Sequence, residues 1–501
     1  MKPSKFNRNT DQQIFIFFLL IFFFIQLFDV FDWAIVSFIA KNIFLIIFLT
    51  YNIIVYRKHN PARWLLNPAV LASLITFLLN YCLTNYVYFI PGSEDEKQMF
   101  RLLGRDYLFF FNKGMNVVIV GAFAMWIGYK SNLGVKLYNF ILRFPINFKK
   151  YFSSSFEPNL PSIYIILVLV IAARVYAIDL GIYGYSQSPD KITASIGIVN
   201  ILLSFSELTS ICLLTVSFAY FSNRKNFKYK FTFLLILITE IIFGILSGLK
   251  SNVVMPIILS FITYYLVNRK INKTFILTAF LLITLAYIII EPFRILRMRD
   301  ASFQSSPTNI ASTMMDAYLM NQSSKIVPGN ENALSLIISR NSYLIATARS
   351  IQYIEVHGLG ALDPDFLEKI YTIPLQAFIP RLFWTGKPIE DTGRWFAVRV
   401  WGITAPGSVA MTPFGFLYFA GGLVFIFFGF LFIGILQKTL WQFYLAGGGQ
   451  LLIFLALLST VVLIDSAYNG IIVTWLRNIP LFILLQSLIL KKTNKFAAIK
   501  N

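Results

Sequence analysis

Long apolar runs, separated by short polar connections, dominate the pattern of this chain. A helix needs about 20 apolar residues to cross the hydrocarbon layer of a membrane, and about twelve runs approach that length. We therefore expect an all-α polytopic membrane protein with about 12 transmembrane helices. The second run is interrupted by Lys41 and Asn42 and fits the pattern least well. The runs lie at roughly residues 12–28, 33–56, 65–90, 107–129, 161–178, 195–221, 231–249, 251–267, 274–290, 412–436, 443–464 and 469–490.

The composition indicates the same class of protein. Hydrophobic residues make up 57% of the chain and charged residues only 13%, which is far more apolar than a soluble domain. The first apolar run, from Ile14 to Phe28, follows a basic start but lacks a cleavage site of small residues, so we expect a retained helix and no signal peptide. Both cysteines lie in apolar runs and the chain has two histidines, so we predict no disulfide framework, no metal site and no cofactor.

Lysine and arginine are concentrated in alternate connections between the runs. One set of connections, together with both ends of the chain, holds more than half of the 43 basic residues and two acidic residues, Asp11 and Glu157. Because cytoplasmic loops are enriched in basic residues, we place both termini in the cytoplasm, which requires an even number of spans. The net charge of +20 is then mostly a topology signal, and no nucleic-acid partner is expected.

The remaining connections form the opposite, outer face, and they include one long polar stretch, residues 291–411. Loops of this length are usually functional or disordered, and apolar residues recur here at helical spacing. We therefore expect one large helical extracytoplasmic loop between helices 9 and 10. The chain is thus divided into a membrane domain of the first nine helices (1–290), the loop that carries the site (291–411), and the last three helices with a cytoplasmic tail (412–501).

Basic residues are abundant in this loop, although positive charge is normally scarce on the outer side. Arg294 and Arg297 follow span nine and would share one face of a helix. Paired guanidinium groups can bind a phosphate through forked hydrogen bonds. The alternative is that these side chains extend to lipid headgroups.

A second basic segment, residues 379–395, contains prolines and glycines that favour a fixed, non-helical path. Trp384 and Trp395 would anchor this segment at headgroup depth. The alternative is an ordinary interfacial loop. Its basic residues are Arg381, Lys387 and Arg394.

Ionisable residues also occur in or beside the spans. Lys250 is the only charge in the outer turn 247–252, where it either extends to the interface or reaches a shared cavity. Glu207 and Glu240 lie near the middles of two spans, where an ionised carboxylate costs a few kcal/mol unless it has a partner. For both we favour interhelical hydrogen bonding over a proton relay. Further candidates for ion pairs are Arg174, Arg477 and Asp465.

Two other motifs carry less weight. Asp363 and Asp365 have the spacing of an acidic metal site, but Asp-Pro-Asp is also typical of a capped helix start, which we favour. His357 could serve as a base together with Glu355, although a single histidine is more often structural.

Several segments between residues 230 and 436 resemble the bacterial Wzy-type polymerases, the family that polymerises O-antigen, capsule or exopolysaccharide repeat units. The most specific is IPRLFWTGKP at 379–388, which has the pattern IPR-x-x-W-x-x-KP. The others are SGLKSNVVMP at 247–256, EPFRILRMRD at 291–300, SRNSYL at 339–344 and TPFGFLYFAGG at 412–422.

This resemblance implies a membrane glycosyltransferase that joins polyprenyl-diphosphate-linked oligosaccharide repeat units on the outer face of the bacterial cytoplasmic membrane. Cationic side chains would stabilise charge on the leaving diphosphate, and a carboxylate or histidine would accept the proton of the attacking hydroxyl. A chain-length regulator is a further expected partner, beside the lipid bilayer and the glycan substrate. We assign diphosphate binding to Lys250, Arg294, Arg297, Arg340, Arg381, Lys387 and Arg394, sugar stacking to Trp384 and Trp395, and catalytic base function to Glu355, His357, Glu390 or Asp391.

Two other function classes stay open. A flippase or transporter for lipid-linked oligosaccharides would also have many spans and a cationic cavity, but alternating access usually requires pseudo-symmetric halves, and no repeat is visible here. An O-antigen-type glycan ligase would use the same donor and the same cationic site, so the sequence barely separates it from a polymerase.

Overall fold

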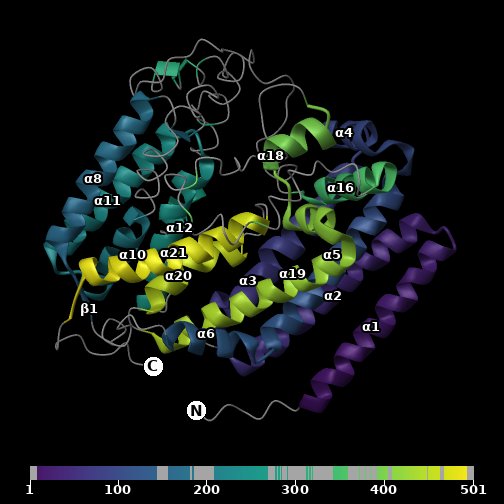
Figure 1. Cartoon of the computed structure of the whole chain (residues 1–501), viewed down its shortest axis with the longest axis horizontal. Helices are drawn as coiled ribbons and strands as arrows, with labels where there is room; N and C mark the ends of the chain where they lie inside the picture. The colour runs from purple at the N-terminus through teal and green to yellow at the C-terminus, as the bar shows by residue number, and fades with distance from the viewer. Residues whose placement is uncertain are drawn as a thin grey trace.

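The computed structural model of this chain describes residues 8–61, 63–143, 156–180, 183–184, 208–268, 342–358, 392–403, 409–447, 450–462 and 468–492, together with isolated positions between 273 and 384. The described part is almost entirely helical (Figure 1). Seven of its helices are long and apolar enough to cross a membrane, and three shorter apolar helices accompany them. The expectation of a mainly helical chain with several helices able to span a membrane is therefore confirmed, and the count of about 12 spans stays a prediction.

The long apolar helices overlap the predicted runs, except that only isolated residues of run nine are described, whereas the helices Glu94–Leu103, Leu133–Arg143 and Leu344–His357 lie between the runs. The third run, Pro68–Phe89, is not a uniform α-helix, since it contains the π-helical segment Ser73–Leu79 and the 3-10 segment Leu83–Phe89. The helices are α1 (Arg8–Val30), α2 (Ala34–His59), α3 (Pro68–Ala72), α4 (Glu94–Leu103), α5 (Tyr107–Lys130), α6 (Leu133–Arg143), α8 (Leu160–Asp179), α10 (Leu208–Ser222), α11 (Phe227–Leu246), α12 (Lys250–Asn268), α16 (Leu344–His357), α18 (Thr392–Trp395), α19 (Pro413–Ala446), α20 (Gln450–Val462) and α21 (Tyr468–Ile489).

The second run is a continuous helix despite its lysine. Lys41 is completely buried in α2, and its ammonium lies 2.5 Å from the carboxylate of Asp29 at the end of α1. Ser37 donates a further hydrogen bond of 2.6 Å to the same carboxylate. A partner of opposite charge offsets part of the cost of burying an ammonium group, and α2 continues through Lys41 without a break.

α5 and α19 form the centre of the larger bundle, and glycines allow their backbones to approach closely. A Cβ atom on Gly128 would lie 2.1 Å from the carbonyl oxygen of Leu431, and one on Gly434 would lie 2.0 Å from that of Met125. Helices in membranes associate largely through such close packing of small residues. Neither glycine can therefore be replaced without moving the two helices apart.

α19 changes direction at a pair of glycines, Gly421 and Gly422. Gly422 has φ 65° and ψ −148°, a conformation that other residues rarely adopt. The part before this kink packs against α16, where a Cβ atom on Gly415 would lie 2.6 Å from the hydroxyl of Ser350. The kink thus allows one helix to contact both α5 and α16.

A second group, α8, α10 and α11, contains a buried ion pair. Arg174 of α8 contacts the carboxylate of Glu240 on α11 through two hydrogen bonds of 2.7 and 3.2 Å, and both residues are almost fully buried. Arg174 also donates to the hydroxyl of Thr209 on α10, at 3.3 Å. Interhelical bonding, the favoured prediction for Glu240, is therefore confirmed, whereas Glu207 and Asp465 lie outside the described residues.

The connections that the charge pattern groups together are in contact in the structure. The short strands β1 (Phe156–Pro158) and β2 (Leu490–Lys492) pair antiparallel, with Glu157 opposite Lys491. Arg224 donates to the side-chain oxygen of Asn268 at 3.1 Å.

α6 lies at one end of the bundle, and α4, α16 and α18 gather at the other (Figure 1). We refer to these as the α6 end and the α4 end.

Candidate functional site

The α4 end begins with a well-capped amphipathic helix. Ser93 is the N-cap of α4 and accepts a hydrogen bond of 3.1 Å from the backbone N–H of Glu96. The Glu96 carboxylate in turn accepts one of 2.6 Å from the backbone N–H of Gly92. This arrangement resembles a capping box and fixes the start of the helix. The chain turns out of α4 at Gly104, which has φ 72°.

Arg349 joins α16 to the two elements beside it. Its guanidinium donates to the carbonyl oxygens of Leu102, at the end of α4, and Val400, at 2.9 Å each. It also donates to the side chain of Gln352, which itself donates to the carbonyl oxygen of Leu103 at 3.2 Å. Burial lowers the pKa of Arg349 from its usual value, but arginine stays charged at neutral pH. The last carbonyl oxygens of a helix have no partner within the helix. Arg349 and Gln352 supply donors for those of Leu102 and Leu103 at the end of α4.

Thr392–Val400 consists of α18 and the π-helical turn η7 (Phe396–Val400). Trp401 follows, and its backbone N–H donates to the carbonyl oxygen of Phe396 at 3.1 Å. The backbone N–H of Ile403 donates to the carbonyl oxygen of Ala397 at 2.9 Å. These bonds turn the chain back toward α4, so that the Trp401 indole faces it.

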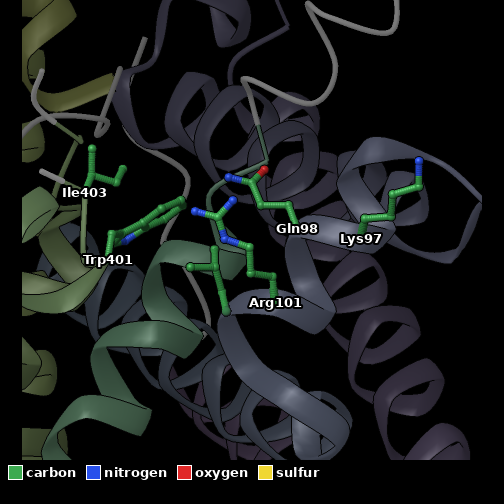
Figure 2. Close-up of a pocket in the computed structure, with 6 residues that line it drawn as sticks. Lys97, Gln98, Arg101, Trp401 and Ile403 are labelled. Carbon is green, nitrogen blue, oxygen red and sulfur yellow. The ribbon is translucent and has the colours of Figure 1, made fainter. Parts of the chain in front are cut away.

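A cavity of about 280 Å³ lies between these elements, and its lining includes two cations, an amide and an indole. Figure 2 shows the guanidinium of Arg101 and the amide of Gln98 directed toward Trp401, while the ammonium of Lys97 extends outward at the rim. The indole N–H of Trp401 is buried and has no hydrogen-bond acceptor among the described residues. The cavity is lined by Lys97, Gln98, Arg101, Leu102, Trp401 and Ile403.

This lining suits an anionic, sugar-bearing ligand. A guanidinium binds phosphate oxygens through forked hydrogen bonds, and an indole provides a flat apolar face with a polar N–H. The amide of Gln98 can both donate and accept hydrogen bonds. These groups come from segments about 300 residues apart in the sequence, so only the fold brings them together.

The carboxylate of Glu355 lies further along α16 than Arg349 and is partly exposed. The ammonium of Lys113, from α5, is 2.5 Å from the carboxylate of Glu355 and 4.2 Å from the ring centre of Phe109. The ion pair holds the Glu355 carboxylate at a defined place between α5 and α16.

Of the predicted site residues, the structure places Glu355, His357, Arg394 and Trp395 at the α4 end, on α16 and α18. His357 stacks on Tyr353 with 4.6 Å between ring centres, and Trp395 contacts the same tyrosine at 6.4 Å. Glu355 and His357, however, are two residues apart on one helix, and such positions do not face each other. The structure therefore does not bring these two candidates together as a catalytic pair.

Other predicted positions are only partly described. Trp384 is half-buried. Lys250 begins α12, but its side chain lies outside the description. The candidates outside the described residues are Arg294, Arg297, Arg340, Arg381, Lys387, Glu390 and Asp391.

Sequence reasoning did not select Lys97, Arg101 or Lys113, whereas Trp401 is one of the loop tryptophans that could stack on sugar rings. A signal was available for the first two, because residues four apart share a helix face and both follow a Ser-x-x-Glu helix start. No comparable signal marks Lys113, which lies inside an apolar helix. Its role depends on a contact with a residue that is 242 positions away.

Residues 169–460 match a family described only as a domain of unknown function, DUF8712. The match covers more than half of the chain. The chain belongs to the DUF8712 family. No curated protein and no solved structure matches it. The DUF8712 region contains Glu355 and Trp401, whereas Lys97, Arg101 and Lys113 precede it, so the cavity combines side chains from inside and outside the DUF8712 region.

Proposed function

We propose that this chain polymerises polysaccharide by joining polyprenyl-diphosphate-linked oligosaccharide repeat units. The observation that carries the proposal is the cavity beside Trp401, where Arg101 directs its guanidinium toward the aromatic ring and Lys97 adds a positive charge at the rim. A lipid-linked glycan presents a diphosphate close to the membrane surface and sugar rings beyond it. The cavity offers groups that suit both parts, near the ends of helices long enough to cross a membrane.

The reaction requires a leaving group and a proton acceptor. A hydroxyl of the acceptor glycan attacks the anomeric carbon of the donor, and the bond from that carbon to the diphosphate oxygen breaks. The polyprenyl diphosphate departs with the electron pair, and cationic groups stabilise its developing charge. In this proposal Arg101 and Lys97 bind the diphosphate, and the Glu355 carboxylate accepts the proton of the attacking hydroxyl. Arg294, Arg297, Arg381 and Lys387 stay candidates for the same diphosphate.

The proposal includes a membrane arrangement. We place about 12 spans in the bacterial cytoplasmic membrane, with both termini in the cytoplasm and the α4 end on the outer face. Two observations support this. The α4 end carries α16 and α18 from the long polar stretch 291–411, and α4 carries the acidic residues Glu94, Asp95 and Glu96. Basic residues are concentrated instead in α6 and in the last turn of α2.

A test starts from a strain that lacks this protein and is complemented with single variants. Surface polysaccharide is separated by length on a gel. We expect wild type to restore the ladder, and Arg101→Gln or Trp401→Ala to leave mainly single repeat units at an unchanged protein level. Arg105→Gln is the matched control, because Arg105 is an exposed arginine just after α4 that does not line the cavity.

The same gel separates the other function classes. Single units that never reach the outer face in the deletion strain would indicate a flippase, and free polymer that stays unattached would indicate a ligase. A normal ladder in both the Arg101 and the Trp401 variant would overturn the assignment of the cavity.

A further inference from the structure

The α6 end carries four cations and six aromatic rings, which we name the cation–aromatic face. Its members come from the end of α2, the turn that follows, α5 and α19. The cations are Arg57, Arg63, Lys130 and Lys438, and the rings are those of Tyr56, Trp64, Trp126, Tyr129, Trp441 and Tyr444.

Each cation lies near the face of one ring. The guanidinium of Arg57 is 5.3 Å from the ring centre of Trp64, and that of Arg63 is 6.0 Å from Tyr444. The ammonium groups of Lys130 and Lys438 are 5.9 Å from Trp126 and 5.1 Å from Tyr129, respectively. Cations within about 6 Å of a ring centre are attracted by the ring. The four charges are therefore held in place on this surface.

The rings also contact one another and join three helices. Trp126 and Tyr129 of α5 have ring centres 5.7 Å apart, and Tyr129 is 6.1 Å from Tyr56 of α2. Tyr56 is in turn 6.1 Å from Trp441 of α19, which stacks on Tyr444 at 4.6 Å. Most of these rings are buried, so they hold Arg63, Lys130 and Lys438 from below, and Arg57 lies beside them over Trp64.

Helix dipoles account for only half of the cluster. Arg57 and Lys130 lie in the last turns of α2 and α5, where a cation interacts favourably with the helix C-terminus. Lys438, however, lies about two turns before the end of α19. Arg63 lies in the turn after α2, beyond its last residue, His59. Helix dipoles therefore do not account for these two positions.

We propose that the cation–aromatic face binds the headgroup phosphate of an anionic phospholipid. Tryptophan and tyrosine concentrate at headgroup depth in membranes, and basic clusters beside spanning helices attract anionic lipids. Arg63 supplies a planar guanidinium suited to phosphate oxygens, and Lys438 supplies a second charge from the neighbouring helix. The site is independent of the polymerase proposal, because it requires only that the helices lie in a membrane.

The test uses the full-length protein in nanodiscs of phosphatidylcholine with increasing fractions of phosphatidylglycerol. Lipids that stay bound after release from the disc are counted by native mass spectrometry. We expect the wild type to retain phosphatidylglycerol in preference to phosphatidylcholine. The double variant Arg63→Gln/Lys438→Gln should lose that preference by about tenfold or more, since each cation near a membrane surface contributes to the attraction.

Lys228→Gln/Lys230→Gln is the matched control, because it removes two exposed lysines from the start of α11, away from this face. The control should retain phosphatidylglycerol like the wild type, and Arg63→Lys/Lys438→Arg should keep most of the preference. An equal loss in the control, or no preference in the wild type, would overturn the proposal. Inorganic phosphate is added in a parallel titration, and competition at millimolar concentration would indicate a free-phosphate site and not a lipid site.

Discussion

Lys113 of α5 and Glu355 of α16 form an ion pair with a distance of 2.5 Å between Nζ and Oε1. The pair connects a membrane-spanning helix with the stretch 291–411. Both side chains are partly exposed, so the pair contributes only about 0.2–1 kcal/mol to stability. Its position beside the cavity elements suggests a chemical role for the carboxylate.

Glu355→Gln should therefore reduce chain extension by roughly 10²–10⁴-fold, the range expected when a general base is removed. Thermal stability in detergent should change by less than about 1 kcal/mol. The rate is measured with a lipid-linked repeat unit and purified protein. Asp106→Asn is the control, since Asp106 is an exposed carboxylate at the same end. Full activity in Glu355→Gln would exclude Glu355 as the base.

Arg349→Met should destabilise the α4 end. The change removes a half-buried charge together with its bonds to Leu102 and Val400, and leaves those carbonyl oxygens without that donor. A buried unsatisfied acceptor costs about 1–3 kcal/mol, so a total of about 2–4 kcal/mol is expected. Thermal unfolding in detergent measures it, with Arg105→Met as the exposed control. Arg349→Lys should recover little, because an ammonium cannot reproduce the fork of the guanidinium. Equal melting temperatures for Arg349→Met and wild type would contradict this role.

Gly128→Ala should separate α5 from α19. Its Cβ atom would lie 2.1 Å from the Leu431 carbonyl oxygen, which cannot move without moving α19. Overpacking of this kind typically costs about 1–3 kcal/mol, and the melting temperature should fall accordingly. Gly92→Ala is the comparison, because Gly92 has φ 77° and open space around it. Gly92→Ala therefore tests backbone strain without a steric clash, and it should lower the free energy of unfolding by about 1–2 kcal/mol. A stable Gly128→Ala protein with wild-type packing would show that the helices are not in close contact there.

Glu240→Gln should destabilise the α8–α11 group by about 3–5 kcal/mol, because it leaves the charge of Arg174 buried without its carboxylate. Replacing both residues, as in Arg174→Met/Glu240→Met, should restore much of the stability. A cycle of the two single variants and the double variant measures the coupling. A proton relay predicts the reverse pattern, in which Glu240→Gln keeps its stability and loses transport.

Arg381→Ala or Arg294→Ala should abolish chain extension and leave the protein level unchanged, because both arginines are predicted to bind the diphosphate. The length distribution of surface polysaccharide is the measurement. Unchanged polymer length in both variants would leave the cavity cations, Arg101 and Lys97, as the binding groups.

The sequence alone predicted the long apolar helices, but it did not predict the cavity or the ion pair between Lys113 and Glu355. Apolar runs predict membrane helices because each helix satisfies its own backbone hydrogen bonds, so the signal is local. Even the run around Lys41 is helical, although its partner Asp29 could not be identified from spacing alone. The cavity depends on α4 meeting Trp401, and the ion pair depends on Lys113 meeting Glu355. Contacts between such distant positions are set by tertiary packing, which periodicity does not encode.

The glycine pair in α19 also sets where the chain leaves the bilayer. Leu423–Ala446 has a length of about 36 Å at 1.5 Å per residue, which already exceeds the roughly 30 Å of a hydrocarbon layer. The apolar turns from Pro413 to Ala420 are therefore not needed for crossing. They are largely buried inside the protein instead, where they form a hydrophobic support for α16.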